Sequence, residues 1–279
     1  MALEQRAQAT TAGTAAAIRA RKKFITAEGL ASTGLAVALV AAAQMASSYG
    51  LVSDLILPKP STVAAVLVEG FASGYYVEHT LSTLTSLLSG FVAASLFAIA
   101  LAGVLSAIPA LERILTPFLV AFQSLPKIAL APLIIIWFGF GAPAKIVIVA
   151  TSCFFPVLIN ALQGLKIRER DRYELLRSLG ATKWQMFVHL RLPDALPYIF
   201  AGLHVGAIFA LIGSVVAEFV GSGQGIGYAM LAAKAQFDVA GVYACLIILM
   251  ALGIALHALM AALERHVAFW VEDLSRVTA

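Results

Sequence analysis

Long apolar runs separated by short charged segments dominate this 279-residue chain. A helix needs about 20 apolar residues to cross the hydrocarbon core of a bilayer. The charge-poor windows therefore predict six membrane-spanning helices. They are centred on residues 30–48, 83–105, 117–138, 145–165, 197–219 and 241–263. Backbone inside a bilayer finds no water to bond, so each span should be helical and the fold all-α.

The composition agrees with this pattern. Hydrophobic residues make up 61% of the chain and charged residues only 12%, whereas a soluble domain carries roughly a quarter charged residues. The formal net charge of +4 does not indicate a nucleic-acid partner, because the basic residues lie in segments between apolar runs. We therefore predict an integral membrane protein surrounded by lipid.

Lys and Arg are distributed unequally between the two sides of the predicted bundle. Fifteen of them lie in residues 1–28, 108–116, 166–196 and 264–279. Only three, Lys59, Lys145 and Lys234, lie on the other side, and Lys127 lies within the third predicted span. The positive-inside rule then places both termini and the 166–196 loop in the cytoplasm of a multi-pass inner-membrane protein. Residues 1–28 are predicted to be a disordered tail, residues 29–265 the six-helix membrane domain, and residues 266–279 a second tail.

The cytoplasmic loop 166–196 carries helix signals of its own. Residues 169–179 have amphipathic spacing, and Gly180 stands where a helix ends in a left-handed residue. Thr182 is placed to cap a second short helix, and Pro193 and Pro197 should end this segment before the fifth span. The pattern predicts two short helices that present Leu, Trp and Phe side chains. An amphipathic loop resting on lipid headgroups is the alternative.

The spacing of Glu174, Gly180 and the segment Leu190-Arg-Leu-Pro193 resembles the glutamate–alanine–alanine loop of bacterial ABC-importer permeases. The chain departs from that motif at Leu175 and Leu176, where the family has two alanines, and at Leu190, where isoleucine is usual. Segments 124–133, 137–139 and 216–218 are similar to the nitrate, sulfonate and taurine subgroup. The resemblance extends from about residue 57 to residue 263.

This resemblance implies a type I permease that pairs with a second permease copy, expected to be identical. It also implies cytoplasmic ATPase subunits docked on coupling helices between spans four and five, and a soluble binding protein that delivers the solute. The ATPase-coupling residues that the motif implies are Tyr173, Glu174, Leu176, Arg177, Leu179, Gly180, Ala181, Trp184, Leu190 and Pro193.

No nucleotide or catalytic site is expected on this chain. The glycine-rich segment 221–227 lacks the Lys that follows the glycines of a phosphate loop, and no Gly-Lys dipeptide occurs anywhere. Its glycines instead predict a tight turn or re-entrant backbone near the mouth of the pathway. We predict a transport subunit without cofactor or metal, whose ATP and magnesium bind to the partner ATPase.

Four polar residues within the spans are candidates for the substrate pathway. They are Lys127, Gln123, His204 and Glu218. Lys127 follows Pro126 and precedes Pro132, a pair that should break the third span and leave a cation facing a pore. Each candidate has a simpler alternative. Lys127 would snorkel, Gln123 and His204 would bond between helices, and Glu218 would be a solvated helix end.

The subgroup resemblance implies a small anion, such as a sulfonate, taurine or nitrate, as the solute. A permease for a vitamin precursor or an aromatic acid is the alternative. A self-contained secondary transporter is an alternative of another class, but no internal repeat of the kind found in many such transporters is visible. An intramembrane enzyme would need a His/Glu metal motif or a nucleophile turn, and the sequence has neither.

Overall fold

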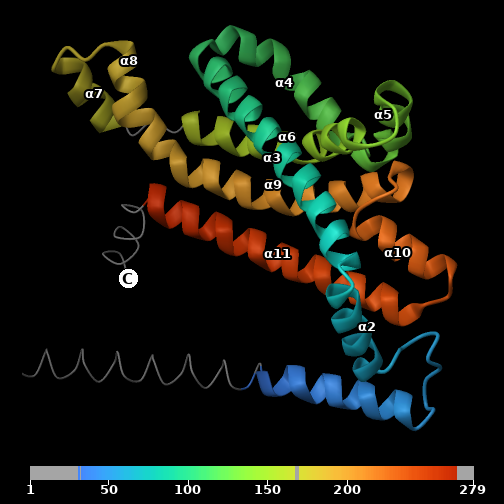
Figure 1. The fold of residues 1–279 in the computed structure, drawn as a ribbon. Coiled ribbons are helices and arrows are strands. Elements are labelled where there is room, and N and C mark those ends of the chain that lie inside the picture. Colours follow the sequence, from blue (N-terminus) through green and yellow to red (C-terminus); the bar gives the residue numbers. More distant parts are fainter. Residues whose placement is uncertain (1–30, 32, 167–169, 269–279) are drawn as a thin grey trace, which may run out of the picture. The chain divides into compact units, whose positions relative to one another are not determined.

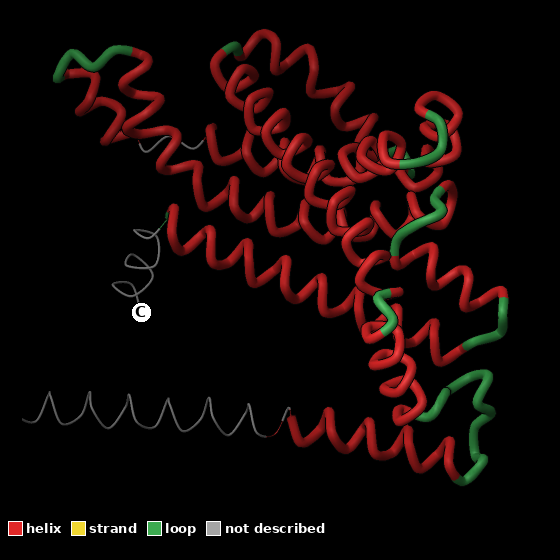
Figure 2. The backbone as a smooth tube through the Cα atoms, viewed as in Figure 1, coloured by secondary structure: helices red, strands yellow, loops and turns green. Residues whose placement is uncertain are grey.

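The computed structural model describes residues 31, 33–166 and 170–268, and for Arg170 the backbone alone. The described residues are helices joined by turns and short loops (Figures 1 and 2). Residues 1–28, residues 269–279 and the loop 167–169 lie outside this range, so the predicted disorder of the N-terminal tail stays a prediction. The chain divides into two units, residues 1–65 and 66–279, which we describe separately.

The first unit contains the helix Thr33–Ser48 and the start of α2 (Pro60–Ala72). The described part of this apolar helix is shorter than a bilayer requires, so the first predicted span is supported only as a helix. The turn between the two helices is held by a hydrogen bond from Ser47 Oγ to Asp54 (2.6 Å) and by one from the Ser61 amide to the Gln44 side chain (3.1 Å).

The second unit is built on four helices that are long and apolar enough to cross a membrane. They are α3 (Tyr75–Ala107), α6 (Ala142–Lys166), α9 (Leu192–Gly221) and α11 (Val239–Val267). Each contains one of the predicted spans, and α3 begins eight residues before the predicted start of its span. The shorter α10 (Ile226–Ala235) follows α9 and packs on α3, α9 and α11 (Figure 1).

A bent pair of helices forms a fifth candidate span. Helix α4 (Pro109–Ser124) and the segment made of η1 (Lys127–Leu130) and α5 (Ala131–Phe138) meet at an angle of 83°. The predicted break at Pro126 is confirmed, because Leu125 and Pro126 are extended rather than helical. Glu112 in the first turn of α4 pairs with Lys166 at the end of α6, whereas α5 packs near the start of α6. The pair therefore runs from one end of the bundle to the other.

Small residues allow α3, α6 and α9 to approach one another closely. Ala98, Ala161 and Ala195 are fully buried in the cluster that joins these three helices. A Cβ added to Gly202 would lie 2.8 Å from Asn160 Cβ, and one added to Gly206 would lie 2.7 Å from Val157 Cγ2. In lipid the hydrophobic effect does not drive helices together, so van der Waals contacts as close as these stabilise their association. The two cysteines, Cys153 and Cys245, are free and buried.

Gly90 on α3 gives a direct test of this packing. A Cβ at Gly90 would lie 2.8 Å from the carbonyl oxygen of Ile146 and 2.7 Å from Val149 Cβ, so α6 would have to move away. We expect Gly90→Ala to lower the melting temperature of the detergent-solubilised protein. The control is Gly103→Ala on the same helix, which meets open space and should stabilise slightly, by about 0.5–1 kcal/mol from helix propensity. Equal melting temperatures for both variants would contradict the close approach.

Candidate functional site

The predicted pair of short helices is present between α6 and α9. Helix α7 (Arg170–Ser178) is followed by Gly180, whose φ of +78° is the left-handed value that the sequence predicts. Thr182 and Gln185 form a complete capping box at the start of α8 (Lys183–Met186). The Thr182 hydroxyl accepts a hydrogen bond from the Gln185 amide, and the Gln185 side chain accepts one from the Thr182 amide. We call residues 170–191 the hairpin.

Large apolar side chains of the hairpin are exposed. Leu175, Leu179 and Trp184 are 60%, 74% and 72% exposed, and the Trp184 ring stacks on Phe187 at a centroid distance of 5.9 Å. A cavity of about 530 Å³ between α7 and the start of α9 is lined by Leu176, Leu190 and Pro193, among others. Arg172 and Asp194 also line this groove, and Arg172 Nη1 lies 3.4 Å from Asp194 Oδ1.

The other residues that the motif implies lie on the same small surface. Leu179, Gly180 and Ala181 line a second hollow of about 370 Å³, while Glu174 and Arg177 are exposed on α7 and Tyr173 is partly buried there. Six of the ten predicted coupling residues therefore line the two hollows of this segment, and the other four lie on α7 and α8. Hydrophobic side chains exposed on a rigid turn are typical of a protein-docking surface.

Pro193 and Pro197 do not end the hairpin, which corrects the sequence-based expectation. Helix α8 continues through the π turn η2 (Phe187–Arg191) into α9, so that residues 183–221 form one continuous helix. Pro193 lies in the first turn of α9, directly after the π turn. The π turn already interrupts the regular i to i−4 bonding, so the missing amide of proline is accommodated there without a break.

Lys127 lies at the break of the bent pair and lines a cavity of about 600 Å³. Its Nζ is 5.0 Å from the centre of the Phe155 ring and 6.0 Å from that of Phe209. The cavity walls come from α4, η1, α6 and α9. Its other polar lining residues are Gln123, Ser152 and Asn160. Two of the four predicted pathway residues, Lys127 and Gln123, are thus brought together at this break.

His204 lies apart from this cavity. Its Nε2 is 3.0 Å from the Glu264 carboxylate on α11, and its ring is 5.0 Å from that of His257. This contact links α9 to α11, which agrees with the interhelical alternative for His204.

Glu218 is not a solvated helix end, which corrects the simpler of the two sequence-based interpretations. Its residue is 1% exposed, at the C-terminal end of α9. One carboxylate oxygen accepts from Thr83 Oγ1 (2.8 Å) and the other from the Gly227 amide (2.8 Å). Lys145 Nζ lies 3.9 Å away, and its side chain is only 6% exposed. A buried carboxylate requires partners of this kind.

These bonds cap the first turn of α10. The amides of Gly225, Ile226 and Gly227 have no acceptor within their own helix. The Gly225 amide donates to His79 Nδ1 (3.0 Å) and the Ile226 amide to Thr83 Oγ1 (2.9 Å), both on α3. The Gly227 amide donates to Glu218, whose charge also suits the positive end of the helix dipole. We call His79, Thr83, Lys145 and Glu218 the polar junction.

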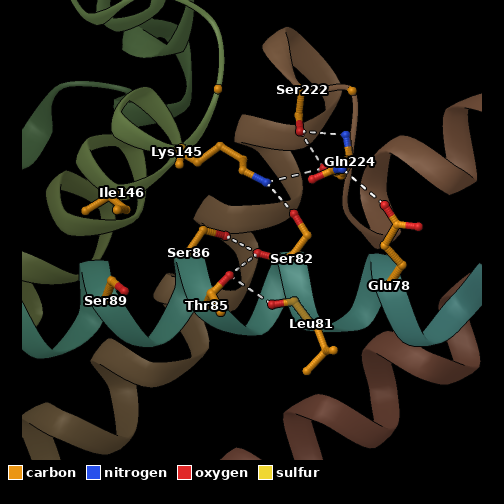
Figure 3. A pocket seen from close by; sticks show the side chains of 13 residues that line it. Glu78, Leu81, Ser82, Thr85, Ser86, Ser89, Lys145, Ile146, Ser222 and Gln224 are labelled. Atoms are coloured by element: carbon orange, nitrogen blue, oxygen red, sulfur yellow. Dashed lines mark hydrogen bonds between the residues drawn. The ribbon is translucent and has the colours of Figure 1, made fainter.

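Sequence analysis did not single out Lys145 or Thr83. Lys145 is the first residue of the predicted span 145–165 and lies in the first turn of α6. Its ammonium group donates to Ser82 Oγ (2.9 Å) and to the Gln224 carbonyl oxygen (3.3 Å), as Figure 3 shows. Ser82, Lys145 and Gln224 line a cavity of about 760 Å³. The buried position of Lys145 follows from its long-range pairing with Glu218, and no local pattern in the sequence indicates it. Among the described residues, no three metal-ligating side chains are grouped to hold an ion.

Comparison with known proteins defines the class. Residues 90–269 match the model of the family described as "binding-protein-dependent transport system inner membrane component". The chain therefore belongs to this family of importer permeases. It is a permease component and not an ATPase, and the system to which it belongs includes ATPase and binding-protein subunits.

Individual relatives differ in the solute that their names give. The chain is 37% identical to a riboflavin transport permease of Chloroflexus aurantiacus, over 77% of this chain and 80% of the relative. It is 34% identical to a formylaminopyrimidine transport permease of Halalkalibacterium halodurans, over 77% and 86%. A taurine transport permease of Escherichia coli is 30% identical, over 79% and 82%.

Gly225 tests the cap on α10. Its φ of +119° is readily adopted by glycine but rarely by residues with a side chain, and an added Cβ would collide with the Glu218 carboxylate. We expect Gly225→Ala to destabilise the folded protein by about 1–3 kcal/mol and to lower its melting temperature in detergent. Gly223→Ala in the same loop meets no atom and has no left-handed φ, so it should leave the melting temperature unchanged. A stable Gly225→Ala variant would mean that the loop does not pack on Glu218.

Proposed function

We propose that this chain is the membrane-spanning permease of an ABC importer for a planar nitrogen heterocycle of the vitamin-precursor type. The observation that carries this proposal is the cavity at the break of the bent pair. It is lined by Lys127, by the Phe209 ring and by the amide and hydroxyl groups of Gln123, Asn160 and Ser152. The Phe155 ring lies 5.0 Å from Lys127 Nζ. Aromatic faces suit a flat ring, and the polar groups suit its nitrogen and carbonyl atoms.

The comparisons support the same class of solute. The riboflavin and formylaminopyrimidine permeases share 37% and 34% of aligned residues with this chain, against 30% for the taurine permease. A small anion such as taurine, a sulfonate or nitrate is the second candidate, and the cation Lys127 is the feature that favours it.

We propose that the cavity faces a second copy of this chain across the pathway. Gln123 is exposed and Lys127 partly exposed in the single chain, on a helix pair apolar enough to cross the membrane. Polar and ionisable groups in a span face protein or water rather than lipid. A symmetric pair of permeases would place two such cavities around one central path.

We further propose that the hairpin docks on the ATPase at the cytoplasmic side. The excess of Lys and Arg in the tails and in residues 166–196 supports this orientation, with both termini in the cytoplasm and a first span near residues 30–48 completing six. The exposed Leu175, Leu179 and Trp184 supply apolar anchors for a groove on the partner.

The docking role is tested by capture of the ATPase. Tagged chain is isolated from native membranes in mild detergent, and its partners are identified by mass spectrometry. We expect Leu179→Asp to reduce the recovered ATPase about tenfold, because a charge would enter an apolar contact while the exposed side chain contributes little to folding. The control is Phe237→Asp, an 80% exposed residue in the turn between α10 and α11. Full recovery with Leu179→Asp would overturn the docking role.

The solute is tested first on the co-purified binding protein. Riboflavin, formylaminopyrimidine, taurine and an alkyl sulfonate are compared by the shift each causes in its melting temperature. We expect a heterocycle to stabilise it, and stabilisation by taurine or the sulfonate alone would favour the anion instead.

Lys127 is tested by uptake of the solute so identified. We expect Lys127→Gln to lower the rate of uptake about tenfold, as for loss of one buried charged hydrogen bond, while the ATPase is still recovered. Lys234→Gln on α10 is the matched control. Undiminished uptake in Lys127→Gln would place the pathway elsewhere.

A further inference from the structure

Two features of the structure stand at opposite ends of one continuous helix. Residues 183–221 begin in the hairpin and end at the polar junction. A helix of 39 residues spans about 58 Å at 1.5 Å per residue. A displacement imposed on the hairpin would therefore reach the other end of α9 without crossing a flexible loop.

At that other end, α9 is tied to three further elements. Thr83 and His79 come from α3, Lys145 comes from the first turn of α6, and the amides of Gly225, Ile226 and Gly227 open α10. The Glu218 carboxylate contacts a group from each of these elements. Hydrogen bonds to a buried charge are stronger than neutral ones, and breaking them leaves that charge unsatisfied.

The segment 221–224 lies between two cavities. Lys145, Ser82 and Gln224 line the one of about 760 Å³, and Phe140, Glu218 and Tyr228 line the other, of about 710 Å³. Ser222 and Gly223 line both. In Figure 3 the loop is held from two sides, by Lys145 on the Gln224 carbonyl and by Glu78 on the Gln224 side chain. A shift of α9 would change both cavities at once.

We propose that Glu218 is a positioning residue for transport, through which the glycine loop 221–225 and α10 follow the movement of the hairpin. Glu218 bonds the Gly227 amide at the start of α10, and its carboxylate lies against Gly225 at the end of the loop. ATP-driven displacement of the hairpin would therefore be transmitted through α9 to the end of the loop and to α10 as a rigid-body shift. Without the carboxylate, the far end of the loop and α10 would be joined to α9 only through the chain at Gly221 and would no longer follow its movement. This inference rests on the proposed docking of the ATPase on the hairpin.

Gly223 provides the reporter. A side chain there meets no neighbouring atom and its φ is ordinary, so Gly223→Cys should fold, and both native cysteines are buried. The complex of the Gly223→Cys chain with its ATPase is reconstituted in nanodiscs. The rate of modification by a membrane-impermeant maleimide is measured with and without ATP plus vanadate. We expect a clear ATP-dependent change in this rate.

Glu218→Ala in the same background removes the anchor, and we expect the ratio of the two rates to fall to unity while ATPase recovery and basal ATP hydrolysis persist. Glu78→Ala is the matched control, because this exposed carboxylate accepts a hydrogen bond from the Gln224 side chain and not from the backbone of the loop in Figure 3. The ratio of the two rates should stay at the parent value in this variant. If Glu218→Ala yields no folded protein, Thr83→Val is used instead. It removes one bond to Glu218 and the acceptor of the Ile226 amide at nearly constant volume, so α10 is held less firmly and the ratio should fall.

The positioning role is overturned if the ratio of the modification rates with and without ATP is unchanged in Glu218→Ala, or in Thr83→Val where Glu218→Ala does not fold. It is also overturned if the modification rate of the parent chain does not change with ATP. A purely structural cap would lower the melting temperature of these variants without altering the ATP-dependent ratio. Failure of the parent chain to retain the ATPase would instead overturn the proposed function itself, and the capture step reports that separately.

Discussion

A charged carboxylate without water needs an equivalent set of hydrogen-bond donors, and Glu218 obtains them from three other parts of the chain. Thr83, the Gly227 amide and the nearby Lys145 ammonium together replace its hydration. The same bonds satisfy the first amides of α10, which would otherwise be buried and unpaired. The position of α10 and of the glycine loop relative to α3, α6 and α9 depends on this one buried charge.

Close packing of small residues supplies the rigid frame around that charge. Glycines and alanines on α3, α6 and α9 let the backbones approach to contact distances that a larger side chain would prevent. The bent pair of α4 and α5 interrupts this frame at Pro126, and the cavity at Lys127 occupies the interruption. A polar site therefore lies where the packing of regular helices stops, while the surrounding helices remain fixed.

The family relationship concerns the helical frame of the permease, whereas the cavity concerns the choice of solute. Relatives named for riboflavin, formylaminopyrimidine and taurine share the frame with this chain at 30–37% identity. Under the proposed function, docking of the hairpin needs only a rigid turn and exposed apolar anchors, which do not depend on the solute. The proposal then assigns specificity to the binding protein and to the few side chains of the cavity, of which Lys127 is the charged member.

The sequence alone determined the helical fold, four long spans, the break at Pro126 and the turn at Gly180 with its cap at Thr182, because each depends on local hydrophobicity or turn chemistry. It also identified the family through the spacing of the hairpin motif. Only the tertiary structure decided that residues 183–221 form one helix and that Glu218 is buried against Lys145 and Thr83. Such pairings join residues up to 135 positions apart, and no local pattern encodes which distant groups will satisfy a buried charge.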